Sequence, residues 1–117
     1  MNSKLTGQNL ISKLLEKAGK YILFQEGYGM TECSPVSHMI PPSSKNKKIG
    51  SCGQTMASSL SKIINPETKE ILGPNEDGEL CVKGGHVMMG YFENEKATRE
   101  TIDEDGWLHT GDIGKKT

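Results

Sequence analysis

The first part of the chain has the hydrophobic period of an amphipathic helix. Over residues 6–20, apolar side chains recur three and four positions apart, with lysine, glutamate and serine between them. Thr6 is placed to cap the start of this helix and Gly19 to end it. The run Tyr-Ile-Leu-Phe at 21–24 then predicts a short buried strand. A helix and a strand followed directly by a glycine-rich segment is typical of an α/β unit with a ligand loop.

The rest of the chain has the short apolar runs and frequent turn residues of β structure. Strands are predicted at 60–65 and 69–72, on either side of a Pro-Glu-Thr turn, and at 78–84 after an Asp-Gly pair. Residues 94–102 predict one short helix, with Asn94 as its N-cap. A second Asp-Gly pair then precedes the run Trp-Leu-His-Thr-Gly-Asp. The chain is therefore predicted to be α+β, with its second half mainly β.

Composition narrows the function classes only slightly. A chain of 117 residues is one small domain or a piece of a larger one. A charged fraction of 25% with a net charge of −1 gives no reason to expect nucleic acid or a membrane surface as a partner. No apolar run has the length of a transmembrane segment, and the first residues lack the core of a signal peptide. Cys33, Cys52 and Cys81 are odd in number and widely spaced, which predicts free thiols in a reducing compartment such as the cytosol.

The stretch Glu-Gly-Tyr-Gly-Met-Thr-Glu at 26–32 is the first candidate for chemistry. Gly27 and Gly29 would let a ligand approach the main chain closely, and Tyr28 between them offers a flat apolar face. Thr31 and Glu32 add a short hydroxyl donor and a hard oxygen ligand. Together these suit a turn that holds an aromatic ring, a phosphate and a metal ion. From these residues alone, a plain loop after a buried strand explains the pattern equally well.

Several common sites lack their sequence motif. His38, His86 and His109 together with three cysteines suggest zinc, but there is no Cys-x-x-Cys and no His-x-x-x-His pair. The chain has no Walker-type phosphate loop, no Gly-x-Gly-x-x-Gly and no Gly-x-Ser-x-Gly nucleophile elbow. We expect His38 and His109 to have structural roles and Trp107 to pack against a strand. Met30 could line an acyl pocket or belong to the core.

Three ordered segments carry a family resemblance. They are the stretch at 26–32, the Gly-Glu-Leu-Cys-Val-Lys-Gly stretch at 78–84, and the long segment 90–114 that ends in Trp-Leu-His-Thr-Gly-Asp-Ile-Gly. Here the sequence resembles the adenylate-forming superfamily of acyl-CoA ligases, luciferases and peptide-synthetase adenylation domains. Within it, the 4-coumarate–CoA ligase and luciferase-like branch is the most similar. The resemblance covers nearly the whole chain.

The resemblance implies a reaction and its cofactors. A carboxylic acid would attack the α-phosphate of ATP to give an acyl-AMP and pyrophosphate, and the thiol of coenzyme A would then take the acyl group. Tyr28 would stack on adenine, with its two flanking glycines lining the pocket. Thr31 would bind the α-phosphate and Glu32 would hold Mg²⁺, so these two would be the catalytic residues. Asp112 would accept hydrogen bonds from both ribose hydroxyls.

The resemblance also implies a division of the chain and a limit on its activity. Residues 1–40 would be the tail of an α/β subdomain that carries the adenine and Mg²⁺ loop. Residues 41–117 would be a β-barrel-like subdomain that ends at the ribose motif. The family's phosphate loop and catalytic lysine have no counterpart here, so we expect a fragment that is inactive alone, from a cytoplasmic or peroxisomal enzyme. The alternatives are a non-catalytic β-module, or part of a luciferase-like or peptide-synthetase adenylation enzyme.

Overall fold

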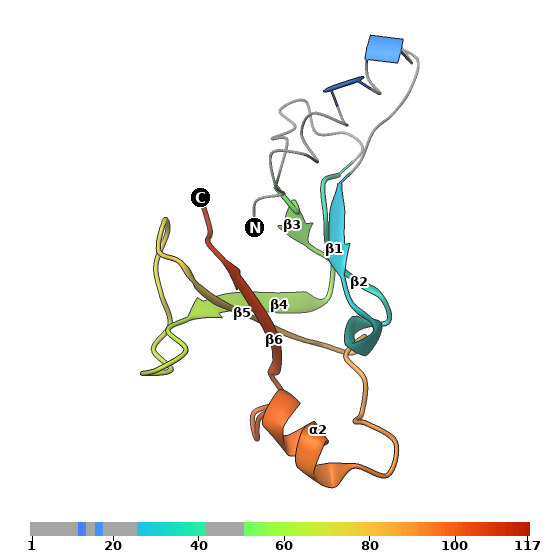
Figure 1. The fold of residues 1–117 in the computed structure, drawn as a ribbon, viewed down its shortest axis with the longest axis vertical. Helices are drawn as coiled ribbons and strands as arrows, with labels where there is room; N and C mark the ends of the chain where they lie inside the picture. The colour runs from blue at the N-terminus through green and yellow to red at the C-terminus, as the bar shows by residue number, and fades with distance from the viewer. Residues whose placement is uncertain (1–11, 14–15, 18–25, 42–50) are drawn as a thin grey trace.

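The computed structural model describes residues 12–13, 16–17, 26–41 and 51–117 (Figure 1). Residues 12–13 and 16–17 are helical, but most of the helix predicted over 6–20 lies outside the described residues. The strand predicted at 21–24 and most of the lysine-rich loop at 41–48 also lie outside them. No helix within the described part is long and apolar enough to cross a membrane.

The first sheet contains β1 (Gly27–Gly29), β2 (Val36–Met39) and β3 (Gln54–Thr55), which pair antiparallel in the order β1-β2-β3. The glycine stretch, predicted as a turn, is therefore a short strand. The turn comes immediately after it, as the 3-10 helix η2 (Thr31–Cys33). The hydrogen bond from the Met30 amide to the Pro35 carbonyl, at 2.7 Å, closes this turn and returns the chain into β2.

Strand β2 buries two polar side chains, Ser37 and His38, which are 0% and 5% exposed. Each has a partner, as buried polar groups require. The Ser37 hydroxyl lies 2.9 Å from Nδ1 of His38, and the Thr55 hydroxyl on β3 lies 3.3 Å from Nε2. Burial lowers the pKa of His38 because it disfavours the charged imidazolium. His38 thus fills a place that an apolar residue occupies in most strands.

The second sheet contains β4 (Ser59–Ile64), β5 (Gly78–Gly84) and β6 (Leu108–Gly114), antiparallel in the order β4-β5-β6. Two of the predicted strands, 60–65 and 78–84, are confirmed by β4 and β5. The prediction of a strand at 69–72 is wrong, because only a single bridge joins Ile71 to Ile64 there. The side chain of Ile71 is 71% exposed, so this segment gains little from burial. The core of the sheet is formed by Ile63, Leu80 and Val82.

The helix α2 (Glu95–Thr101) lies beyond one end of β6, at the bottom of Figure 1. Its predicted N-cap is confirmed, since the side-chain oxygen of Asn94 accepts the amide of Ala97 at 3.0 Å. After the helix, a turn leads to Trp107, and the ammonium of Lys62 on β4 lies 4.2 Å from the centre of its indole. This arrangement is a cation–π contact on the second sheet.

The two sheets contact each other, and Tyr28 of the first packs against the core of the second. The hydroxyls of Thr55 and Ser61 lie 2.6 Å apart, and the amide of Met88 donates to the carbonyl of Glu32 at 2.9 Å. In Figure 1, β1 and β2 run nearly upright whereas β4 runs across the view. The helix α2 and the two antiparallel sheets together confirm the predicted α+β class. The division at residue 40 stays a prediction; β3 comes after that point in the chain and pairs with β2 before it.

Candidate functional site

A hydrogen bond joins the first and the third of the segments that carry the family resemblance. The phenol of Tyr28 on β1 donates to Oδ2 of Asp112 on β6 at 2.5 Å. Burial of the phenol, and then its bond to Asp112, raises the pKa of Tyr28 well above its usual value, so the hydroxyl keeps its proton. The Tyr28 ring also packs edge-on against His38, with the ring centres 6.0 Å apart. An aromatic ring and a carboxylate are thereby held side by side.

The backbone of Asp112 is held in place by hydrogen bonds of Thr110, two residues before it. The hydroxyl of Thr110 donates to the Leu80 carbonyl on β5 at 2.8 Å. The same oxygen accepts the amide of Asp112 at 3.1 Å. Because a hydroxyl can donate and accept at once, Thr110 links the Asp112 backbone to the neighbouring strand. The carboxylate of Asp112 stays half-exposed at the edge of the sheet.

Gly29 has a structural reason to be a glycine. A Cβ built on it would lie 1.9 Å from the carbonyl oxygen of Pro35, a distance that no side chain can occupy. At Gly27 the corresponding contact, with the His38 carbonyl, is 3.2 Å and merely tight. The close return of the chain after η2 therefore requires Gly29 whether or not a ligand approaches. Its predicted place in an adenine pocket stays a prediction.

Thr31 and Glu32 lie in η2, directly after β1. Thr31 is exposed and Glu32 is half-buried. Within the described residues, no hydrogen bond or ion pair engages the Glu32 carboxylate, although its backbone carbonyl is held by Met88. A half-exposed carboxylate without a protein partner is a suitable oxygen ligand for Mg²⁺, so the residues present fit that ion. Among the described members of the predicted set, direct side-chain contact joins only Tyr28 and Asp112.

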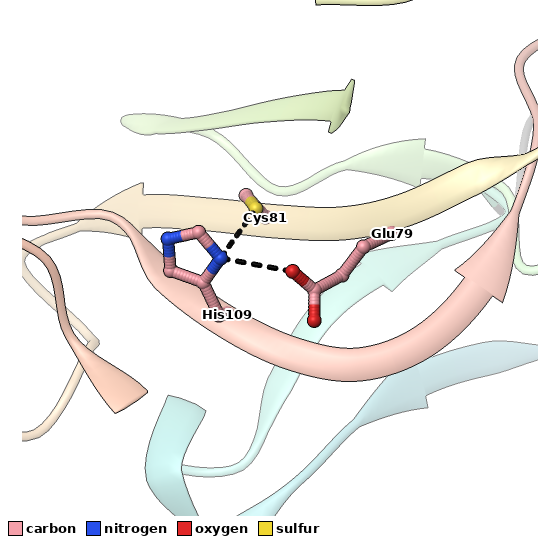
Figure 2. Close-up of side chains that lie close together, drawn as sticks. All are labelled: Glu79, Cys81 and His109. Atoms are coloured by element: carbon pink, nitrogen blue, oxygen red, sulfur yellow. Dashed lines mark hydrogen bonds and ion pairs between the residues drawn. The ribbon is translucent and has the colours of Figure 1, made fainter. Parts of the chain in front are cut away.

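A second group of side chains surrounds His109 on the sheet formed by β4, β5 and β6 (Figure 2). Its Nδ1 lies 2.9 Å from Oε1 of Glu79 and 3.5 Å from Sγ of Cys81. Its Nε2 lies 3.0 Å from Oδ2 of Asp103. Glu79 and Cys81 are two residues apart on β5, and Cys81 pairs with His109 across the strands. We call Glu79, Cys81, Asp103 and His109 the His109 cluster.

Two members of the His109 cluster, Asp103 and Cys81, have shifted pKa values. Burial acts to raise the pKa of Asp103, but hydrogen bonds from Trp107, His109 and Asp105 outweigh it and the pKa is lowered. Burial, and then the charge of Glu79, raises the pKa of Cys81 to about 11. Cys81 is therefore a protonated thiol near neutral pH. Sequence reasoning missed this cluster because its members come from two strands and a turn, with no local spacing to reveal them.

Comparison with known proteins identifies the family. The model of the family described as "AMP-binding enzyme" matches residues 5–92. The chain belongs to the AMP-binding enzyme family. It is 49% identical over 111 residues to 4-coumarate-CoA ligase 1 of Narcissus pseudonarcissus, in a match that covers 92% of this chain and 20% of that protein. The predicted resemblance to adenylate-forming enzymes of the 4-coumarate–CoA ligase type is thus confirmed.

Solved structures of family members have the same fold. O-succinylbenzoate coenzyme A synthetase of Bacillus subtilis, in complex with AMP, superposes with a TM-score of 0.77 at 32% identity, over 97% of this chain and 22% of that one. A luciferase-like enzyme from the nonluminescent mealworm Zophobas morio gives a TM-score of 0.77 at 35% identity, over 98% of this chain and 27% of that one. The chain spans about a fifth of the length of the curated relatives it matches.

Proposed function

We propose that these residues form the part of an acid–CoA ligase that binds adenosine and Mg²⁺. In such an enzyme a carboxylic acid attacks the α-phosphate of ATP, which gives an acyl-AMP and pyrophosphate, and coenzyme A then displaces AMP. The observation that carries the proposal is the Tyr28–Asp112 hydrogen bond. It joins the aromatic residue of one family motif to the carboxylate of another across 84 positions of sequence.

The contact favours recognition of an adenine nucleoside. The face of Tyr28 would stack on the base, which an aromatic ring does with a favourable offset geometry. Asp112 accepts a hydrogen bond from the Tyr28 hydroxyl at Oδ2 and has Oδ1 left to accept from ribose hydroxyls. Tyr28 would therefore have two roles, as a stacking surface and as the group that orients Asp112. Gly27 and Gly29 would line the edge of the same pocket.

Thr31 and Glu32 are proposed as the residues that act at the phosphates. The Thr31 hydroxyl is exposed and can donate to the α-phosphate, where charge grows as the acid attacks. The Glu32 carboxylate would hold Mg²⁺, which when bound neutralises charge on the phosphate oxygens. The anchor of Glu32 is its backbone carbonyl, fixed by the amide of Met88. That bond would keep η2 in place while the side chain turns toward the ion.

The relatives support a ligase that transfers an acyl group to coenzyme A. The curated relatives are named as 4-coumarate–CoA ligases, and one solved neighbour is a coenzyme A synthetase. We propose a small-molecule carboxylic acid as the substrate and a cytoplasmic or peroxisomal location. A chain of 117 residues without the family's phosphate loop is proposed to be inactive by itself.

A chimeric enzyme tests the proposal. The segment of this chain that matches the Narcissus ligase, 92% of its length, would replace its counterpart in that protein. We expect the chimera to catalyse ATP–pyrophosphate exchange that depends on 4-coumarate, whereas the chain alone should not. A chimera that melts at the temperature of the parent ligase and still fails to exchange would contradict the proposal. Exchange by the chain alone, at a rate similar to the chimera, would contradict its inactivity.

A further inference from the structure

In the His109 cluster, each ring nitrogen of His109 faces a carboxylate oxygen at hydrogen-bond distance. Nδ1 lies 2.9 Å from Glu79, and Nε2 lies 3.0 Å from Asp103. A neutral imidazole has only one N–H and can donate to only one of the two carboxylates. The other nitrogen presents a lone pair to a carboxylate oxygen, which is repulsive. Either a second proton or a cation must therefore lie between the ring and one of the two carboxylates.

The side of the ring that faces Asp103 is the better place for the proton. Oδ1 of Asp103 accepts the amides of Asp105 and Trp107, at 3.0 and 2.9 Å, which fixes the carboxylate in the turn before β6. Its other oxygen is thereby aimed at Nε2 of His109. A carboxylate that accepts one ring N–H of a histidine is the usual partner of a metal-binding histidine, because it orients the other nitrogen toward the metal. The lone pair of Nδ1 then points to Glu79 and Cys81, as Figure 2 shows.

We propose that Glu79, Cys81 and His109 bind a Zn²⁺ ion. Their ligand atoms, Oε1, Sγ and Nδ1, all lie within 4.8 Å of one another. Zn²⁺ binds sulfur at about 2.3 Å and nitrogen or oxygen at about 2.0–2.2 Å, so tetrahedral ligand atoms stand roughly 3.3–3.6 Å apart. The Sγ–Nδ1 distance of 3.5 Å meets this already, and the Oε1–Nδ1 distance of 2.9 Å needs a small rotation of Glu79.

The chemistry of the three donors selects the metal. A thiolate with an imidazole favours zinc over the hard ions Mg²⁺ and Ca²⁺, which prefer oxygen ligands alone. On binding, the Cys81 thiol releases its proton to solvent, because the thiolate is the form that binds metal. Cys81 is fully buried, whereas the side chains of Glu79 and His109 keep 16% and 19% of their exposure. That opening gives the ion a way in and leaves a fourth position for water.

The site is distinct from the proposed nucleotide pocket and needs no ATP. It would cross-link β5 and β6, and through Asp103 the turn that precedes β6. Since Asp112 lies three residues after His109 on β6, a bound ion would also stiffen the strand that presents the ribose ligand. A test of the metal site is therefore independent of the proposed acid–CoA ligase function.

Cobalt substitution tests the site in the full 117-residue chain. Co²⁺ bound to a thiolate in tetrahedral geometry gives a charge-transfer band in the near ultraviolet and visible ligand-field bands. We expect one equivalent of Co²⁺ to produce both, and Zn²⁺ to displace it. Cys81→Ser should weaken binding by about 100-fold or more, since even outer hydrogen-bond partners of metal ligands change affinity by 10–100-fold. Cys52→Ser, which removes a thiol outside the cluster, should leave the bands unchanged.

Asp103→Asn keeps the test decisive if Cys81→Ser fails to fold. The introduced amide would retain an oxygen for the two backbone N–H groups and place an NH₂ group where Oδ2 now faces Nε2 of His109. That donor would move the ring proton to Nδ1 and block it as a ligand. We expect Co²⁺ affinity to fall about 10–100-fold with little change in melting temperature. The absence of a thiolate charge-transfer band, or binding that neither substitution weakens, would overturn the proposal and leave His109 as an imidazolium between two carboxylates.

Discussion

The phenol oxygen of Tyr28 and a carboxylate oxygen of Asp112 lie 2.5 Å apart, although one belongs to the first sheet and the other to the second. The hydrogen bond between the two residues therefore forms only while the two sheets keep their position relative to each other. The Tyr28 ring also packs against the core of the second sheet, so the hydrogen bond adds to an apolar contact between the two sheets. A site built in this way couples nucleotide recognition to the packing of the sheets.

Replacement of Tyr28 by Phe measures that contribution. The ring and its packing on His38 remain, and only the donor to Asp112 is lost. A hydrogen bond to a charged group contributes roughly 1.5–3 kcal/mol, but a half-exposed carboxylate can be rehydrated, so we expect a loss of about 1 kcal/mol. Urea unfolding should show a lower midpoint with the same slope. An unchanged midpoint would mean that water replaces the bond without cost.

The same substitution should alter the response to alkaline pH. The pKa of Tyr28 is raised in the folded chain, so its contribution to stability is complete below the unfolded value of about 10. Above that pH the unfolded chain loses the Tyr28 proton while the folded chain keeps it, and stability falls as the pH rises. The wild-type chain should therefore lose stability above about pH 10 more steeply than Tyr28→Phe. Parallel pH profiles of the unfolding midpoint would contradict this.

Asp112→Asn, made in the chimeric ligase, separates a ribose ligand from a structural residue. One acceptor oxygen is kept and the other becomes a donor. A hydrogen bond to a charged group contributes about 1.5–3 kcal/mol, which is roughly a tenfold to hundredfold loss of ATP affinity. The variant should also discriminate less between ATP and 2′-deoxy-ATP than the unsubstituted chimera. A large drop in melting temperature with unchanged discrimination would assign Asp112 to the fold alone.

Glu32→Gln in the same chimera tests the Mg²⁺ ligand. The amide has the shape of the carboxylate but lacks the charge that attracts a divalent ion. Loss of one such electrostatic group typically reduces turnover by about 10²–10³. The Mg²⁺ concentration needed for half-maximal exchange should rise as well. If turnover and the Mg²⁺ requirement both stay at the level of the unsubstituted chimera, Glu32 is not the ligand.

Gly29→Ala should be strongly destabilising for steric reasons alone. The new Cβ would meet the Pro35 carbonyl at 1.9 Å and force β1 and β2 apart. Overpacking of this kind costs about 1–3 kcal/mol, and backbone atoms yield least, so we expect about 3 kcal/mol. Gly85→Ala is the matched control, because a Cβ there has no heavy atom within 4 Å. Equal melting temperatures for the two variants would refute the steric explanation.

The elements that the sequence predicted well are those with a strong local signal. The helix α2 begins at Glu95 because the side chain of the preceding Asn94 caps the amide of Ala97, and a cap depends only on neighbouring residues. Strand β5 follows an Asp-Gly turn and buries Leu80 and Val82 on the sheet core. In each case the local preference and the tertiary structure agree, which is why periodicity and turn chemistry sufficed.

The elements that the sequence did not predict owe their position to distant partners. Strand β2 buries Ser37 and His38, whose hydrogen bonds replace the apolar pattern that identifies a strand. Likewise, the family motifs identified Tyr28 and Asp112 as ligands, but their mutual hydrogen bond depends on how two sheets pack. The His109 cluster is assembled by cross-strand pairing, and pairing register cannot be derived from the spacing of residues along one chain.

The position of Trp107 gives the molecule an internal spectroscopic probe. The chain has one tryptophan, and its indole lies 4.2 Å from the Lys62 ammonium and 5.9 Å from that of Lys83. Its emission therefore reports on the β4-β5-β6 sheet and not on the sheet that carries Tyr28. Comparison of indole fluorescence with far-ultraviolet circular dichroism during denaturation would reveal whether both sheets unfold in one cooperative step. Coincident curves would mean that each sheet depends on the other for its stability.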